Sequence, residues 1–308
     1  MAGPSARRCP RIPIDERRLT LILILMNIAK IKGWSALKKR QLAVRLSLAR
    51  GHPPVLVHQM GKVGSTSLIH ALRGLRGLPP VCQTHFLTLD GISEAKAIIR
   101  GWGIAKANHL EFSDFVATHV RARKSSGPSW QVITIVRDPV ARQLSDIYQN
   151  PGVVGEAKDG IPSAERVLEY LTAYFHEFDE STDFVCRWFQ HEFIDLFDFP
   201  VYEQSFPYEQ GYEIFEGGNV RALVLRLEDF PGVIDDGEAL GAFFGREIPA
   251  KISQRNAAHD RDSFNSYDAA KSKLKIPRSD LEKIYSTAFA RHFYSDCREA
   301  LITRWAGE

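Results

Sequence analysis

The sequence predicts an α/β protein of three layers, in which a central, mainly parallel sheet is flanked by helices. Three aliphatic runs, at residues 55–57, 132–136 and 222–227, are apolar almost throughout, as buried parallel strands are. The first two runs each lead into a turn and then into apolar residues at helical spacing. Repeated strand–loop–helix units of this kind are typical of a parallel sheet covered by helices.

Weaker patterns predict the remaining elements. Short apolar runs at 81–87 and 104–110 indicate two further strands, and the polar stretch 251–275 is expected to be a loop. The stretch 198–215 is rich in aromatic residues and is broken by Pro and Gly, and we expect most of its rings in the core. Helical spacing predicts helices at 92–99, 112–120, 161–178, 183–197, 233–244 and 277–292, and a last one from about residue 295.

Charge is unevenly distributed along the 308 residues, although the net charge is only +3. Residues 1–50 hold twelve Lys and Arg against two acidic residues, so the remaining 28 basic and 35 acidic residues leave a balance of −7. We therefore predict a basic N-terminal arm with amphipathic helices at 1–50 and one main domain at 51–308. Such an arm either rests on an anionic membrane surface or polyanion, or is a solvated basic helix. No nucleic-acid partner is expected.

The apolar run at 19–31 is about 13 residues long and contains Asn27 and Lys30. It is shorter than the roughly 20 residues that span a bilayer, so an interfacial or packing helix is predicted, with a short signal anchor as the alternative. The four cysteines, Cys9, Cys82, Cys186 and Cys297, are scattered and form no CxxC pair. They are typical of reduced thiols in a cytoplasmic protein, and neither a structural disulfide nor a metal site is expected.

The first predicted strand leads into a loop with two glycines, Gly61 and Gly64. The hydroxyl cluster Ser65, Thr66 and Ser67 follows and opens a helix. Exposed backbone N–H groups and a helix N-terminus both favour an anion, and Lys62 adds a positive charge. This stretch predicts a phosphate-binding loop, and the fold is accordingly expected to be P-loop-like.

The strand at 132–136 ends in Arg137, at the edge of the sheet where parallel α/β proteins bind ligands. Asp138 is suited to cap a helix whose first residue is Pro139, and Ser145 lies about two turns into that helix. Because both strand–loop–helix units direct basic and hydroxyl groups to the same sheet edge, we expect them to hold the two ends of one anionic ligand.

Together the two stretches resemble the sulfotransferases that use 3′-phosphoadenosine-5′-phosphosulfate (PAPS). The resemblance implies that Lys62, Val63, Gly64, Ser65, Thr66 and Ser67 grip the 5′-phosphosulfate, and that Arg137 and Ser145 grip the 3′-phosphate. It also implies PAPS as co-substrate with no metal, and Lys62 as the group that stabilises the leaving 5′-phosphate.

The segment from Gln83 to Leu87 resembles the segment of carbohydrate sulfotransferases that carries the catalytic base. Several of those enzymes have a Glu at the position of Gln83. A glutamine cannot accept a proton, so the resemblance assigns the role of general base to His85. His109 is the alternative base. We interpret the other nearby histidines as structural: His58, His119 and His292.

More narrowly, the chain is similar over about residues 54–305 to the bacterial putative capsular polysaccharide synthesis family. Five stretches of this chain resemble blocks of that family: GKVGST, THFL, VRDPVARQLS, LRLED at 225–229 and RHFY at 291–294. The similarity implies transfer of a sulfuryl group to a carbohydrate hydroxyl, which leaves sugar stacking as a second interpretation of the aromatics at 202–215. Glu228, within LRLED, is interpreted either as orienting a site residue or as a capping or packing residue.

Two other functions remain as alternatives. A P-loop NTPase or small-molecule kinase needs G-x-x-x-x-G-K-[ST], with the lysine after the second glycine, whereas Lys62 precedes Gly64. A non-enzymatic factor for polysaccharide assembly at a membrane surface would account for the basic arm.

Overall fold

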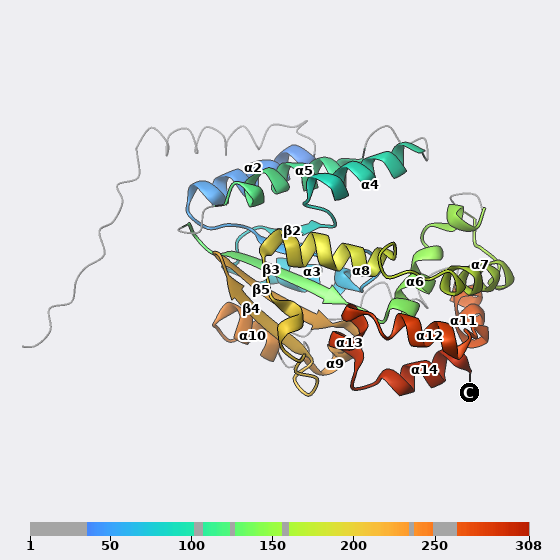
Figure 1. Cartoon of the computed structure of the whole chain (residues 1–308). Coiled ribbons are helices and arrows are strands. Elements are labelled where there is room, and N and C mark those ends of the chain that lie inside the picture. The colour runs from blue at the N-terminus through green and yellow to red at the C-terminus, as the bar shows by residue number, and fades with distance from the viewer. Residues whose placement is uncertain are drawn as a thin grey trace, which may run out of the picture.

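A five-stranded sheet forms the centre of the computed structural model, which describes residues 36–101, 107–123, 127–155, 160–233, 237–248 and 264–307 (Figure 1). The strands lie in the order β2-β1-β3-β5-β4, and all but β4 run parallel. Their bounds are β1 Val55–His58, β2 Val81–Thr84, β3 Trp130–Val136, β4 Tyr212–Gly217 and β5 Val220–Arg226. The prediction of an α/β fold with a mainly parallel sheet is confirmed.

The position of β1 inside the sheet determines where a ligand is expected. The chain leaves β1 toward β2 on one side and returns to β3 on the other, with Val57 opposite Gln83 and Ile133. The carboxyl ends of β1 and β3 therefore flank the topological switch point, which is where open parallel sheets bind ligands. The loops after these two strands are those that carry Lys62 and Arg137.

Helices surround the sheet. Figure 1 shows α2, α4 and α5 together beyond β2, and α12, α13 and α14 near the carboxyl ends of the parallel strands. The helices are α2 Ala36–Ala49, α3 Ser65–Gly74, α4 Leu89–Gly101, α5 Asn108–Arg121, α6 Pro139–Ile147, α7 Ala164–His176, α8 Phe184–Trp188, α9 Phe230–Val233, α10 Glu238–Phe244, α11 Phe264–Lys273, α12 Arg278–Ile284, α13 Ala288–Tyr294 and α14 Arg298–Ala306. A π-helical turn, Phe189–Asp195, continues α8 directly.

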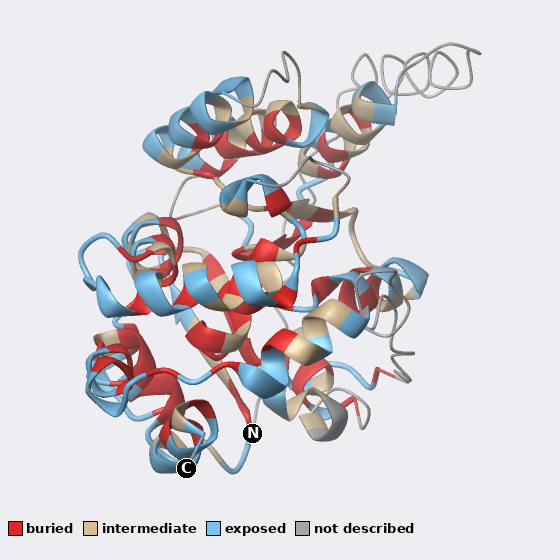
Figure 2. Ribbon diagram, turned by 90° about the vertical axis from the view of Figure 1, so that its right-hand side faces the viewer, coloured by how far each residue is buried: buried red, intermediate tan, exposed pale blue. Residues whose placement is uncertain are grey.

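The core lies on the sheet and the helix faces turned toward it (Figure 2). β1 is buried along its whole length, and β3 and β5 are buried except at their second residue. In the stretch 198–215, Phe199, Phe206 and Tyr212 are buried, whereas Tyr202 is exposed. The expectation that most of these aromatics belong to the core fits the buried rings.

Two predicted elements were wrong where the structure describes them. Residues 108–110 are not the end of a strand but the start of α5, whose Leu110, Phe112, Val116 and Val120 form a buried helical face; residues 104–106 lie outside the described residues. Residues 264–273 of the predicted loop form α11, which packs against α7. α11 is polar because only one of its sides packs against the protein. Composition alone does not distinguish such a helix from a loop.

Three further differences concern a strand that was not predicted and the limits of two helices. The sequence interpretation did not identify β4, which pairs with β5 through a two-residue turn at Gly218 and Asn219, both with positive φ, as hairpin turns require. The helix predicted at 277–292 is two helices, because the Thr287 side chain caps α13 by accepting from Ala290 N. The helix at 161–178 is the shorter α7, capped by Ser163.

The N-terminal arm is described only from residue 36. Within it, α2 packs against α5, Val44 is buried in the common core, and the Arg40 guanidinium lies 3.9 Å from the centre of the Phe112 ring. The apolar run at 19–31 lies outside the described residues, and contact of the arm with a membrane stays a prediction. Among the helices of the described ranges, none is long and apolar enough to cross a membrane.

The described cysteines, Cys82, Cys186 and Cys297, are free thiols, and Cys9 lies outside the described residues. Burial raises the pKa of Cys82 to about 12, which keeps this thiol protonated and unreactive. The described part of the chain contains no group of three or more His, Cys, Asp or Glu arranged to hold a metal ion.

Candidate functional site

The loop between β1 and α3 has the strained backbone of an anion-binding loop. Lys62 and Gly64 have φ of 75° and 73°, in the left-handed region that favours glycine. Gly64 is the N-cap of α3, and the first turn of this helix contains no acidic residue. The first N–H groups of α3 have no partners inside the helix, and the helix dipole favours negative charge at this end.

Two arginines from the β3–α6 unit hold this loop. Arg137 donates from Nη1 to the Lys62 carbonyl at 2.7 Å, and Arg142 donates from Nε to the Gly61 carbonyl at 3.3 Å. In a trans peptide the N–H points opposite to the preceding C=O, so the Lys62 and Val63 amides are turned away from the arginines. The structure thus joins the two loops that the sequence predicts to share one ligand.

Arg142 was not singled out by the sequence interpretation. It is buried on α6, paired with Asp146 at 3.3 Å, and its guanidinium lies 4.5 Å from the centre of the Phe184 ring. Burial lowers the pKa of Arg142, and the Asp146 charge opposes this shift. An arginine on the apolar face of a predicted helix is the signal that would have identified it.

The remaining predicted anion-binding residues lie on the two helices that follow the loops, α3 and α6. Ser65 and Ser67 are buried in the first turn of α3, and Thr66 is exposed between them. Ser145 is half-buried on α6, three residues after Arg142, and therefore on a neighbouring part of the same helix face. Contact of these hydroxyls with a ligand stays a prediction.

Gln59 links the loop to the predicted base, and the sequence interpretation missed it. Its Nε2 donates to Ser65 Oγ, and its backbone carbonyl accepts from His85 Nδ1 at 2.9 Å. Its backbone N donates to Thr84 O at 3.2 Å. Gln59 Oε1 is buried and has no hydrogen-bond partner among the described residues. As the first polar residue after a buried strand, Gln59 was recognisable in the sequence.

His85 has the protonation state of a general base. A carbonyl oxygen can only accept, so the contact with Gln59 O places the proton of the neutral ring on Nδ1 and leaves the Nε2 lone pair available. Burial lowers the pKa of His85, and the positive charges of His109 and Lys62 lower it further. The ring is therefore neutral at pH 7.

A buried carboxylate supports the segment that follows His85. Glu192 Oε2 accepts from Leu87 N at 2.6 Å and from Thr88 N at 3.1 Å, just before α4 begins. Trp188 Nε1 donates to the His85 carbonyl at 2.6 Å. Both side chains come from the segment of α8 and the π-helical turn, and such turns are frequent at functional sites. These bonds hold the His85 carbonyl and the backbone of the two residues before α4.

The other histidines differ from His85. His58 is fully buried between Thr84 Oγ1, at 3.0 Å from Nδ1, and Glu192 O, at 2.9 Å from Nε2, and burial lowers its pKa to about 3. His292 is buried on α13 with Nε2 3.3 Å from Glu213 Oε2. These environments fit the structural interpretation of both residues. His109 is exposed in the first turn of α5, where it remains the alternative base.

The residue after Arg137 is fixed by the C-terminal helices. Asp138 caps α6 by accepting from Val140 N at 3.1 Å, as the sequence predicts. Tyr285 donates to Asp138 Oδ1 at 2.7 Å and Trp305 donates to Oδ2 at 2.8 Å. Burial raises the pKa of Asp138, and the Tyr285 and Trp305 hydrogen bonds oppose this shift. Both oxygens are committed inside the protein, so Asp138 is a structural cap.

Gly64→Ala is expected to destabilise the protein by about 1–2 kcal/mol, because an L-residue is strained at this positive φ. A Cβ here would also lie 2.7 Å from Leu227 Cδ1. Urea unfolding measures the loss, and Gly64→Ala in a Leu227→Ala background separates the two causes. The smaller side chain relieves the contact but not the backbone strain, so a residual loss of about 1 kcal/mol is expected there. Equal stability of Gly64→Ala and the parent would contradict the strained loop.

Comparison with known proteins gives one match. Residues 166–295, less than half of the chain, match the family described as "Putative capsular polysaccharide synthesis protein". The matched part contains β4, β5, Glu192, the LRLED stretch and RHFY, whereas the loop with Lys62, His85 and Arg137 precedes it. No curated protein and no solved structure matches the chain.

Proposed function

We propose that this protein is a PAPS-dependent sulfotransferase that transfers a sulfuryl group to a carbohydrate hydroxyl. The observation that carries the proposal is the hydrogen bond from Arg137 to the Lys62 carbonyl, which unites two cationic loops at the switch point of the sheet. The match of residues 166–295 to a capsular polysaccharide synthesis family supports a carbohydrate acceptor.

The residues present fit a ligand with two separated phosphate groups. On the β1 side, Lys62, Val63, Gly64, Ser65, Thr66 and Ser67 offer a positive charge, backbone amides and hydroxyls to the 5′-phosphosulfate. On the β3 side, Arg137 and Ser145 offer a guanidinium and a hydroxyl to the 3′-phosphate. Arg142, which lies on α6 after β3, supports the residues on the β1 side because it donates to the Gly61 carbonyl.

In the proposed reaction the acceptor hydroxyl oxygen forms a bond to sulfur while the bond between sulfur and the bridging oxygen breaks. The electron pair of that bond goes to the 5′-phosphate, and Lys62 with the loop amides stabilises the resulting charge. The hydroxyl proton goes to His85 Nε2, which is free to accept it because Nδ1 is bound to Gln59 O.

The NTPase alternative requires a carboxylate that binds the magnesium ion, commonly after a strand beside the phosphate loop. Asp138 occupies that place here, but its oxygens accept from Tyr285, Trp305 and Val140. Lys62 also precedes Gly64. Both observations favour the sulfotransferase over the NTPase.

Titration calorimetry tests the proposal directly. We expect adenosine 3′,5′-bisphosphate to bind in EDTA, and ATP to bind more weakly with or without Mg²⁺. Transfer of labelled sulfate from PAPS is then measured with a panel of polysaccharides and smaller hydroxyl acceptors. Binding of Mg·ATP alone would replace the proposal by the NTPase. Binding without transfer to any acceptor would favour the non-enzymatic assembly factor.

A further inference from the structure

We propose that the turn after β5, Leu227–Asp229, is a positioning element that fixes the two anion-binding loops relative to each other. We call this turn the β5 clamp. The inference rests on the proposed function for the identity of the ligand, but not for the clamp itself.

The first contact of the clamp is with the β1 loop. The Leu227 side chain covers Gly64 so closely that a Cβ on Gly64 would lie 2.7 Å from Leu227 Cδ1. Gly64 is the residue from which α3 begins, so Leu227 limits where the N-terminus of this helix can lie. The contact lies at the edge of the core, because Leu227 is half-buried and Gly64 is exposed.

The second contact is with the β3 loop. Glu228 Oε1 accepts from the backbone N of Asp138 at 3.0 Å. Asp138 directly follows Arg137, so this bond orients the peptide that joins the two residues. Two successive residues of one short turn therefore touch both loops, and these contacts favour the orienting role for Glu228.

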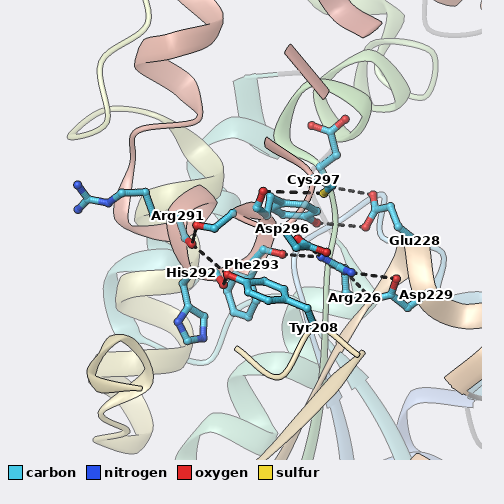
Figure 3. Close-up of polar contacts among 12 residues, drawn as sticks. Tyr208, Arg226, Glu228, Asp229, Arg291, His292, Phe293, Asp296 and Cys297 are labelled. Atoms are coloured by element: carbon cyan, nitrogen blue, oxygen red, sulfur yellow. Dashed lines mark hydrogen bonds and ion pairs between the residues drawn. The ribbon is translucent and has the colours of Figure 1, made fainter. Parts of the chain in front are cut away.

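The clamp is itself locked to α13 and the residues after it. Tyr294 donates to Glu228 Oε2 at 3.2 Å, so each oxygen of the Glu228 carboxylate has a partner. At the end of β5, Arg226 binds Asp229 through Nε at 2.5 Å and through Nη2 at 3.1 Å. Its Nη1 donates to Asp296 Oδ1 at 2.8 Å and to Phe293 O at 2.9 Å (Figure 3).

These contacts make the clamp rigid rather than adaptable. Arg226 is buried, and its fork uses nearly its full donor capacity on partners from two parts of the chain. The hydrogen bonds with Asp229 and Asp296 raise the pKa of Arg226 despite its burial, so its charge is permanent. The clamp and its lock lie almost wholly within residues 166–295, whereas both anion loops precede them.

The experiment compares three variants with a matched control. Glu228→Ala removes the clamp carboxylate, Glu228→Gln keeps an acceptor for Asp138 N–H, and Tyr294→Phe removes only the hydroxyl that locks it. Tyr208→Phe is the control, because Tyr208 lies in the same cluster but donates to His292 O at 2.9 Å rather than to Glu228 (Figure 3).

Two measurements are made on each full-length variant, with melting temperature recorded alongside. Hydrogen exchange of the Asp138 amide without ligand is expected to quicken at least about tenfold in Glu228→Ala, less in Tyr294→Phe, and not in the other two. Titration with adenosine 3′,5′-bisphosphate is expected to show about tenfold weaker binding for Glu228→Ala. Adenosine 5′-phosphate, which lacks the group that Arg137 would bind, is expected to lose less than about threefold.

Unchanged exchange of the Asp138 amide in Glu228→Ala would overturn the clamp, and so would an equal effect of Tyr208→Phe and Tyr294→Phe. Equal losses for the two nucleotides would also overturn it, because a general loss of stability would weaken both alike. If the parent protein binds neither nucleotide while the exchange pattern holds, the proposed function fails and the clamp stands.

Discussion

His85→Ala is expected to lower kcat for sulfate transfer by about 10²–10⁴-fold, the usual contribution of general base catalysis. Affinity for adenosine 3′,5′-bisphosphate should change little, because the groups proposed to bind its phosphates lie on the β1 and β3 loops rather than on the His85 ring. Steady-state kinetics with labelled PAPS measures the first quantity and calorimetry the second. The Gln59 carbonyl should stay in place in this variant, because Gln59 directly follows β1.

His109→Ala is the matched comparison, because His109 is the other candidate base and its charge also acts on His85. We expect its kcat to stay within about threefold of the parent, the size of a small electrostatic effect. A loss of 10²-fold or more in His109→Ala, with His85→Ala nearly active, would transfer the role of base to His109.

The same assignment predicts the acid limb of the pH profile. A base must be unprotonated to act, so kcat/KM falls as pH drops through the pKa of His85 in the free enzyme. Burial, with the charges of His109 and Lys62, lowers that pKa below its ordinary value of 6.5. The midpoint of this decline should therefore lie below pH 6.5. A midpoint above 6.5 would contradict the environment described for His85.

Arg137→Ala is expected to weaken binding of adenosine 3′,5′-bisphosphate by about 10- to 100-fold. A hydrogen bond between charged groups contributes about 1.5–3 kcal/mol. Part of the loss should come from the β1 loop, because Arg137 also holds the Lys62 carbonyl. Arg137→Lys should recover only part of the affinity, since lysine keeps the charge but not the planar fork.

Arg123→Ala provides the control for Arg137→Ala. Arg123 likewise donates to backbone carbonyls, those of Val120 and Leu196, but it follows α5 and bonds to neither the β1 loop nor the β3 loop in these contacts. Its removal should change stability without a selective effect on the bisphosphate. Equal weakening by both substitutions would mean that Arg137 acts only through the fold.

Much of the fold was predictable because the central strands are apolar runs with turn residues after them. β1, β3 and β5 appear where the runs at 55–57, 132–136 and 222–227 predict them. β4 was missed because an edge strand is half-exposed and its residues mix aromatic and charged types. Its hairpin turn, Gly218-Asn219, was nevertheless a usable signal.

For the site, the sequence predicts which residues carry charge at the sheet edge, but not what supports them. Lys62 and Arg137 are recognisable because glycine, proline and capping residues mark their loops. Glu192 supports the His85 segment from more than a hundred residues away, and Trp305 supports Asp138 from even farther. Such contacts depend on how helices pack, and no local pattern in a single sequence encodes them.

The hydrogen bond between Asp138 and Trp305 has a consequence for how the protein is made. Its two partners are separated by 167 residues, so at about 5–20 residues per second the ribosome adds Trp305 roughly 8–33 s after Asp138. During that interval the nascent chain carries a carboxylate destined for the interior without the indole that satisfies it. The full set of hydrogen bonds to Asp138, the residue after Arg137, can therefore form only after Trp305 has been made.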